Sequence, residues 1–298
     1  MKEPSSPKWS SLGLLVGLIL GIGILANLLS LGIWHVFEIP YDGLSGENIL
    51  SSMQRFRLRL GLSVNHLGLF LIPGILWLMY VPQNKFSYLK RRLTKDWQIL
   101  QWILIVFCSY PLIASLAQWN MSISLPEWMQ SSNDAQMVLM QQLLIMDNVG
   151  ELLFNLILVG ALAAIGEEII FRGIIQQVLT DRLKSPFAAI VISSIIFGAF
   201  HMQFERFLPL AFLGLLLGLA YYYFESILLV VILHFLNNSI QVILLYFSNT
   251  SELPDIDDVP DIPIQVTIAS IILTGGLIYF AISRSNVSRS NKSYELRS

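Results

Sequence analysis

Apolar stretches long enough to cross a bilayer dominate this chain. Crossing the hydrocarbon core, about 30 Å thick, takes about 20 apolar residues in a helix. Eight stretches meet that requirement, and they cover residues 11–37, 61–81, 97–117, 152–179, 187–204, 207–224, 227–247 and 264–283. Hydrophobic residues make up 55% of the chain and charged residues only 13%, unlike ordinary soluble domains. Because a backbone in lipid must satisfy its own hydrogen bonds, we predict an all-α membrane bundle of about eight transmembrane helices.

The distribution of lysine and arginine predicts the orientation of this bundle. These residues concentrate on the cytoplasmic side of membrane proteins. With the N-terminus inside, thirteen of the 18 fall on the inner side and four on the outer side, while Arg172 lies within a stretch. We therefore predict a multi-pass protein of the plasma membrane with both termini cytoplasmic. The outer cluster of Arg55, Arg57 and Arg59 opposes this assignment, and an interfacial segment there would explain it.

One membrane domain is expected to account for nearly the whole chain. Residues 1–10 and 285–298 are short predicted cytoplasmic tails, and residues 11–284 form a single transmembrane domain. A mixed polar and apolar segment within residues 131–150 is typical of an interfacial helix or of an outward extension of the fourth stretch. The net charge of -2 excludes a nucleic-acid partner, because no dense basic surface is available. The lipid bilayer is the surrounding medium that the composition predicts.

Five ionisable side chains interrupt the apolar stretches, namely Glu167, Glu168 and Arg172 in the fourth, His201 in the fifth and His234 in the seventh. A charge at mid-membrane costs about 2.5–3.5 kcal/mol on insertion scales, so such residues usually mark a functional site. Polar groups in lipid must be satisfied by one another or by water. We therefore expect three helices to bring these groups together in one polar cavity, open toward the cytoplasmic half.

Helical spacing separates the two adjacent glutamates. Glu168 and Arg172 are four residues apart, with the acid on the N-terminal side, which is the better orientation for an ion pair. Glu167 is turned by about 100° from Glu168 and lacks that partner. A carboxylate so placed is suited to act as a general base, which takes a proton from water and gives it back. His234 and Asn238 also share a helix face, with Asn237 as the alternative amide.

These residues form three linked motifs, Glu167-Glu168 with Arg172, Phe197 with His201, and His234 with Asn238. The combination resembles the signature of the CAAX prenyl protease 2 and bacterial abortive-infection-like family of intramembrane proteases. That signature reads E-E-x-x-x-R, F-x-x-x-H and H-x-x-x-N. The resemblance covers about a third of the chain, residues 152–247. It implies an eight-helix fold and an endopeptidase that hydrolyses peptide bonds of membrane-associated proteins or peptides.

Carried over residue by residue, the resemblance implies that Glu167 activates the attacking water. His201, His234 and Asn238 then bind either a metal or the oxyanion. Catalytic zinc commonly takes three protein ligands, so the metal version needs Glu167, Asn238 or another group beside His201 and His234. The metal-free version uses Glu167 as the base and histidine and asparagine donors to hold the oxyanion. Both versions, with one divalent metal or with none, stay open at this point.

The other residues in the apolar stretches are interpreted as structural or supporting. Glu168 and Arg172 compensate each other's charge. Phe197 is expected to pack against the site and shape its wall. His35 and His66 have no charged companion at helical spacing, so both are expected to be structural.

Two other functions also place acids and imidazoles inside a membrane. A proton-coupled transporter uses such groups as a relay. A non-catalytic scaffold keeps a protease fold while it binds and regulates partners, because fold alone does not determine function. Replacing Glu167 by glutamine separates these alternatives, since only a protease loses peptide cleavage.

Overall fold

Helices make up all of the regular structure in the part of the chain that the structure describes. The structure, a computed structural model, describes residues 9–36, 50–81, 89–90, 92, 94–248 and 261–295. The elements are α1 (Trp9–Val36), α2 (Ser52–His66), η2 (Leu67–Leu71), α3 (Ile72–Tyr80), α4 (Asp96–Met121), α5 (Glu127–Leu144), α6 (Val149–Asn155), η3 (Leu156–Leu162), α7 (Ala163–Glu168), η4 (Ile169–Gln176), α8 (Gln177–Leu183), α9 (Pro186–Phe200), η5 (Phe204–Arg206), α10 (Phe207–Phe224), α11 (Ile227–Ser248) and α12 (Ile264–Glu295). Of the predicted tails, residues 1–8 and 296–298 lie outside the described residues.

Seven helical segments within the described ranges are long and apolar enough to cross a bilayer. Two of them are composite, because α2, η2 and α3 form one span from Ser52 to Tyr80, and α6 to α8 form another from Val149 to Leu183. An eighth apolar helix, α9, has only 15 residues, which is about 22 Å of helix. The prediction of about eight membrane helices in an all-α bundle is confirmed. The orientation of the termini stays a prediction.

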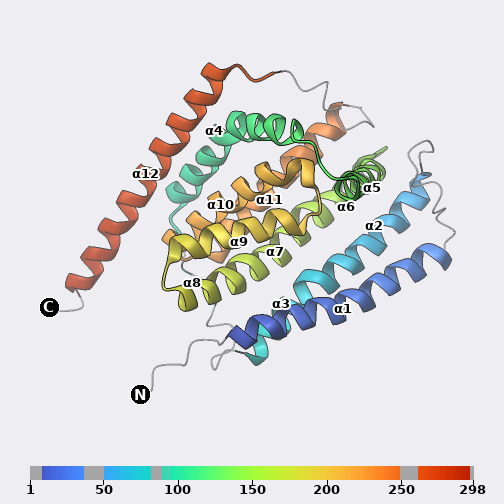
Figure 1. The fold of residues 1–298 in the computed structure, drawn as a ribbon, viewed down its shortest axis with the longest axis horizontal. Helices are drawn as coiled ribbons and strands as arrows, with labels where there is room; N and C mark the ends of the chain where they lie inside the picture. Colours follow the sequence, from blue (N-terminus) through green and yellow to red (C-terminus); the bar gives the residue numbers. More distant parts are fainter. Residues whose placement is uncertain are drawn as a thin grey trace.

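The fourth span, α6 to α8, lies in the middle of the bundle (Figure 1). It contacts η2 and α3 on one side, α9 on another, and α11 along η3 and α7. One buried apolar cluster joins α1, α3, η4 and α9, and a second joins α4, α10 and α11, with α12 against it. α12 packs along α4 at the periphery. Side chains of the fourth span are therefore the ones that several helices can reach.

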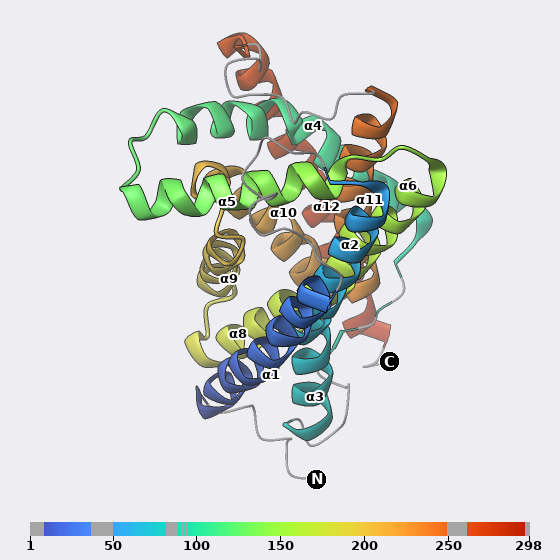
Figure 2. The ribbon, with the colours of Figure 1, turned by 90° about the vertical axis from the view of Figure 1, so that its right-hand side faces the viewer.

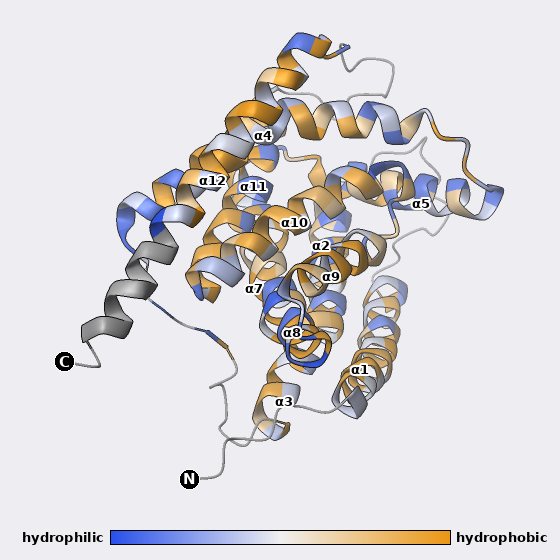
Figure 3. Ribbon diagram, turned by 60° about the vertical axis from the view of Figure 1, so that its left-hand side comes forward, coloured by the Kyte–Doolittle hydropathy of each residue, from blue (hydrophilic) through white to orange (hydrophobic). Residues whose placement is uncertain are grey.

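Outward-facing side chains of the peripheral helices are apolar. Leu25 of α1 is 63% exposed and Ile272 of α12 is 67% exposed. Orange, hydrophobic residues accordingly recur along the ribbon of α1 and along the coloured part of α12 (Figure 3). An exposed apolar surface of this extent is expected where lipid replaces water as the solvent.

The short helix α9 ends before the predicted stretch does. It begins with Ser185, whose side chain accepts a hydrogen bond from the Ala188 backbone, and with Pro186, which suits the first helical position. It ends at Phe200, whereas the sequence placed the end of this stretch at residue 204. Met202 adopts a left-handed φ of 55°, which is incompatible with continued helix. His201 therefore lies at a helix terminus inside the bundle.

The first part of the mixed segment at residues 131–150 belongs to α5, a separate helix that runs across one end of the bundle (Figure 2). α5 ends at Leu144, and a new helix begins at Val149 after Asn148, whose side chain accepts a hydrogen bond from the Glu151 backbone. α5 is thus not continuous with the fourth span, and its interfacial position stays a prediction. Asparagine in this capping position favours a helix start rather than a continuous span.

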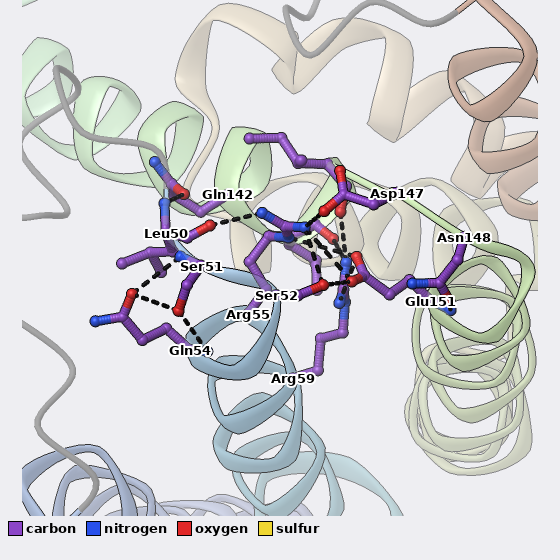
Figure 4. A network of polar contacts seen from close by, with 12 residues as sticks. Leu50, Ser51, Ser52, Gln54, Arg55, Arg59, Gln142, Asp147, Asn148 and Glu151 are labelled. Atoms are coloured by element: carbon purple, nitrogen blue, oxygen red, sulfur yellow. Dashed lines mark hydrogen bonds and ion pairs between the residues drawn. The ribbon is translucent and has the colours of Figure 1, made fainter.

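Two of the three arginines at the start of α2 are buried among polar partners, while the interfacial position of this segment stays a prediction. Arg55 and Arg59 are only 2% and 1% exposed. Figure 4 shows both reaching Glu151, with Arg59 Nη1 3.1 Å and Arg55 Nε 3.4 Å from Glu151 Oε2. Arg55 also pairs with Asp147, and Arg59 Nε donates to Asn155 Oδ1 over 3.0 Å. This ion cluster ties α2 to α6.

Candidate active site

The two adjacent glutamates lie in a short α-helical segment between two π-helical ones. α7 holds Glu167 and Glu168, η3 precedes it and η4 follows it. π-helical turns are rare and occur frequently at functional sites. Just before the acids, Gly166 allows a close approach of the second span, since a Cβ there would lie 3.0 Å from both His66 Nε2 and Phe70 Cβ. The acids therefore face the interior of the bundle, with Glu168 fully buried and Glu167 7% exposed.

Glu168 and Arg172 form the predicted ion pair. Arg172 Nη1 lies 2.9 Å from Glu168 Oε1, and Arg172 Nη2 donates to the Gly214 carbonyl over 3.0 Å. Glu168 Oε1 also lies 2.8 Å from His234 Nδ1. A carboxylate only accepts hydrogen bonds, so this contact places the proton of a neutral imidazole on Nδ1 and leaves Nε2 as an acceptor. The buried pair thus sets the tautomer and the orientation of His234.

His201 is oriented in the same way by the backbone. Its Nδ1 lies 2.8 Å from the Phe197 carbonyl oxygen, which only accepts, so Nε2 is again the free acceptor of a neutral ring. Phe197 is completely buried, and its ring centroid lies 4.7 Å from that of His201 and 5.8 Å from that of His234. The Arg172 guanidinium lies 4.5 Å from the same ring. Phe197 therefore packs against both imidazoles and the arginine.

Both imidazoles present Nε2 to Glu167. His201 Nε2 lies 3.7 Å and His234 Nε2 3.9 Å from Glu167 Oε2. These separations are too long for direct hydrogen bonds but suit a bridging water. Glu167 Oε2 is shielded from solvent and has no hydrogen-bond partner among the protein groups described. A buried carboxylate between two oriented imidazoles can take a proton from a water held among them.

The two asparagines of α11 face different neighbours. Asn238 Nδ2 donates to the Val159 carbonyl of the fourth span over 3.0 Å, which leaves it a second N–H. Asn237 receives a hydrogen bond from the Tyr110 hydroxyl of α4 over 3.3 Å and donates to Asn238 Oδ1 over 3.1 Å. Asn238 is therefore the amide on the side of the Glu167 helix. Neither asparagine is in hydrogen-bond contact with Glu167 in the described structure.

The candidate metal ligands converge without forming a metal centre. Among the described residues, no three His, Cys, Asp or Glu side chains are arranged to hold a metal ion. The gaps of 3.7 and 3.9 Å from Glu167 to His201 and His234 exceed the separation of about 3.4 Å between two ligand atoms of a tetrahedral zinc site. The metal-assisted and the metal-free versions of the site both stay predictions.

His66 lies next to this cluster, although the sequence indicated a structural role. It stacks on Phe70 with ring centroids 4.6 Å apart, and its buried Nε2 has no hydrogen-bond partner. It is close enough to Glu167, His201 and His234 to interact electrostatically with each of them. No spacing along the second span could have shown this, because every one of these neighbours comes from another span.

Comparison with known protein families agrees with the three motifs. Residues 149–240 match the model of the Rce1-like family, described as type II CAAX prenyl endopeptidase Rce1-like. The matched segment contains all of the motif residues, and the predicted resemblance to the CAAX protease family is confirmed. No curated protein and no solved structure matched the chain.

Proposed function

We propose that this protein is an intramembrane endopeptidase in which Glu167 activates the water that attacks the peptide bond. The observation that carries the proposal is the position of Glu167 Oε2, 3.7 Å from His201 Nε2 and 3.9 Å from His234 Nε2. The match of residues 149–240 to a family of CAAX prenyl endopeptidases supports a protease that acts within the membrane.

Each step of the reaction has a group to perform it. Glu167 takes a proton from water, the oxygen forms a bond to the peptide carbonyl carbon, and the carbonyl oxygen becomes an oxyanion. When the carbon–nitrogen bond breaks, the protonated Glu167 returns that proton to the leaving nitrogen. The oxyanion can accept a hydrogen bond from the second N–H of Asn238. A protonated His201 or His234 supplies a further donor.

Glu168 and Arg172 act through His234 rather than on the substrate. Their pair is electrically neutral, so it adds no net charge to the site while Glu168 keeps His234 Nε2 directed at Glu167. This resembles the general arrangement in which a buried carboxylate orients a histidine.

The proposed substrates are membrane-associated proteins or peptides, and the proposed location is the plasma membrane. The family description names a CAAX prenyl endopeptidase. A peptide ending in a prenylated CAAX sequence is therefore the first synthetic substrate to test, beside the native membrane proteins.

A comparison of membrane proteomes tests the function. Cells that express the wild-type protein should show new protein termini that are missing with Glu167→Gln at equal expression. Glu127→Gln is the matched control, because Glu127 is an exposed acid at the start of α5. Identical termini with wild type and Glu167→Gln would contradict a protease and favour a scaffold or a transporter.

The metal requirement is tested separately. If the carboxylate and imidazoles act without a metal, purified protein treated with a chelator and dialysed should cleave at the untreated rate. Loss of cleavage that zinc restores would show that the ligands close around an ion in the working enzyme.

A further inference from the structure

A small cavity lies between α5 and the segment that follows α9. It is lined by Asn133, Gln136, Met137, Met140, Gln203, Glu205 and Arg206. The first four of these residues belong to α5, and the others belong to the turn around η5. The mechanism proposed above uses none of them.

The cavity is connected to the site through three residues of backbone. Gln203 follows His201 by two residues, so their Cα atoms are separated by at most about 7.6 Å. The intervening Met202 accepts a hydrogen bond at its carbonyl from Ser132 Oγ of α5 over 3.2 Å. α5 thus holds the chain immediately after His201, and the cavity follows along the chain from one of the two imidazoles that face Glu167.

Asn133 provides a binding group that the protein itself leaves unused. Its side chain is only 8% exposed, and its Oδ1 accepts a long hydrogen bond of 3.5 Å from the Glu205 backbone. Its Nδ2 is shielded from solvent and has no partner among the described groups. A buried unsatisfied donor costs about 1–3 kcal/mol, so a ligand that accepts this N–H gains an interaction for which no competing partner must be displaced.

The chemistry of the cavity matches a peptide main chain better than a charged ligand. Asn133, Gln136 and Gln203 are carboxamides, each with both donors and an acceptor, as in a peptide group. Glu205 and Arg206 carry opposite charges and leave no net charge for an ionic ligand. Met137 and Met140 supply flexible apolar surface that adapts to different side chains.

We propose that α5 and residues 203–206 form a subsite that binds the unwound main chain of the substrate next to the scissile bond. The proposal rests on the proposed function. A transmembrane helix must unwind before a peptide bond can reach Glu167, and each unwound peptide group then loses its helical hydrogen-bond partner. In a medium without water these groups need new partners, and the carboxamides of the cavity supply them.

Peptide binding to an inactive enzyme tests the subsite. The probe is a fluorescent synthetic peptide that spans the most abundant cleavage site found in the proteome comparison, titrated against Glu167→Gln protein in lipid nanodiscs. When Asn133→Leu is combined with Glu167→Gln, the affinity for the peptide should fall roughly tenfold, the loss expected for one hydrogen bond to a buried group. Gln136→Leu should act in the same direction, and it keeps the test valid if the buried substitution disturbs folding.

Gln130→Leu is the matched control, because Gln130 is an exposed carboxamide on the same helix that does not line the cavity. It should leave binding unchanged. In the active enzyme, Asn133→Leu should raise KM and leave kcat nearly unaltered. Equal affinities for the parent, Asn133→Leu and Gln136→Leu proteins would overturn the subsite while the function stands. Cleavage by the Glu167→Gln protein itself would instead overturn the function.

Discussion

Two clusters of buried charge interrupt the apolar helices of this protein, and they differ in how completely they are paired. In the first, Glu151 has both carboxylate oxygens in contact with Arg55, and Arg59 and Ser52 add further contacts. In the second, Glu168 is paired with Arg172, but Glu167 has no arginine, and its Oε2 has no hydrogen-bond partner among the described groups.

The difference indicates which cluster performs chemistry. Protonating a carboxylate in a fully paired buried cluster is strongly unfavourable, because the loss of its charge leaves the partner arginine uncompensated. An acid that neighbours only imidazole acceptors can gain or lose a proton without breaking a strong ion pair. The Glu151 cluster is therefore expected to stabilise the fold, and the Glu167 cluster to carry activity.

The largest effect is expected at Glu167, and it tests whether the Glu167 cluster carries the activity. Glu167→Gln should lower the cleavage rate by about 100- to 10,000-fold, the range attributed to general acid–base catalysis. It should leave unfolding unchanged, because Glu167 makes no ion pair to arginine or lysine in the described structure. Cleavage kinetics and denaturant unfolding of the same purified sample provide the two measurements. A destabilised Glu167→Gln protein would show that this acid is structural after all.

Glu151→Gln should show the opposite behaviour. Removing its charge leaves Arg55 and Arg59 buried with one acid fewer, and breaking such a cluster costs about 3–5 kcal/mol. Unfolding followed by the fluorescence of the buried Trp77 and Trp102 reports this loss. The protein that remains folded should cleave at the wild-type rate per molecule. Unaltered stability would mean that the cluster does not hold α2 and α6 together.

Arg172→Lys sharpens the comparison within the second cluster. Lysine keeps the charge but lacks the planar fork that contacts both Glu168 and the Gly214 carbonyl. The His234 ring is then oriented less precisely. This should lower kcat about tenfold, equivalent to the loss of one hydrogen bond to a charged group, while KM changes little. A variant with normal kcat and reduced stability would limit Arg172 to charge compensation.

His66→Phe should have the smallest effect. Phenylalanine preserves the stacking on Phe70 but removes both ring nitrogens, that is, the unpartnered Nε2 beside the site and the hydrogen bond of the ring to the Leu162 backbone. If Nε2 accepts a hydrogen bond from the water near Glu167, cleavage should fall about fivefold, the value of one ordinary hydrogen bond. His35→Phe is the control, since His35 lies in the last turn of α1. Equal rates for both variants would return His66 to the structural role that the sequence indicated.

Several features of this protein follow from local chemistry alone. Apolar stretches of sufficient length predict membrane helices, and four-residue spacing predicts the pair of Glu168 with Arg172, which the structure confirms. Both are properties of a single helix, so a linear sequence contains them. The three motifs also identified the family resemblance, because the residues that define it lie on the fourth, fifth and seventh predicted helices.

Other features depended on contacts between distant segments. Arg55 contacts Glu151, which lies 96 residues further along the chain. The sequence therefore showed an arginine without a partner where the structure shows an ion pair. The π-helical turns around α7 and the early end of α9 were also missed, because they depend on packing rather than on composition.

The sequence by itself determined that this chain forms membrane helices, which residues carry charge into them, and which of those residues share a helix face. Only the tertiary structure decided that the Nε2 atoms of His201 and His234 both face Glu167, that His66 lies beside them, and that α5 covers the chain after His201. The physical reason is that periodicity defines directions within one helix. The relative rotation and depth of different helices are set by how their side chains pack.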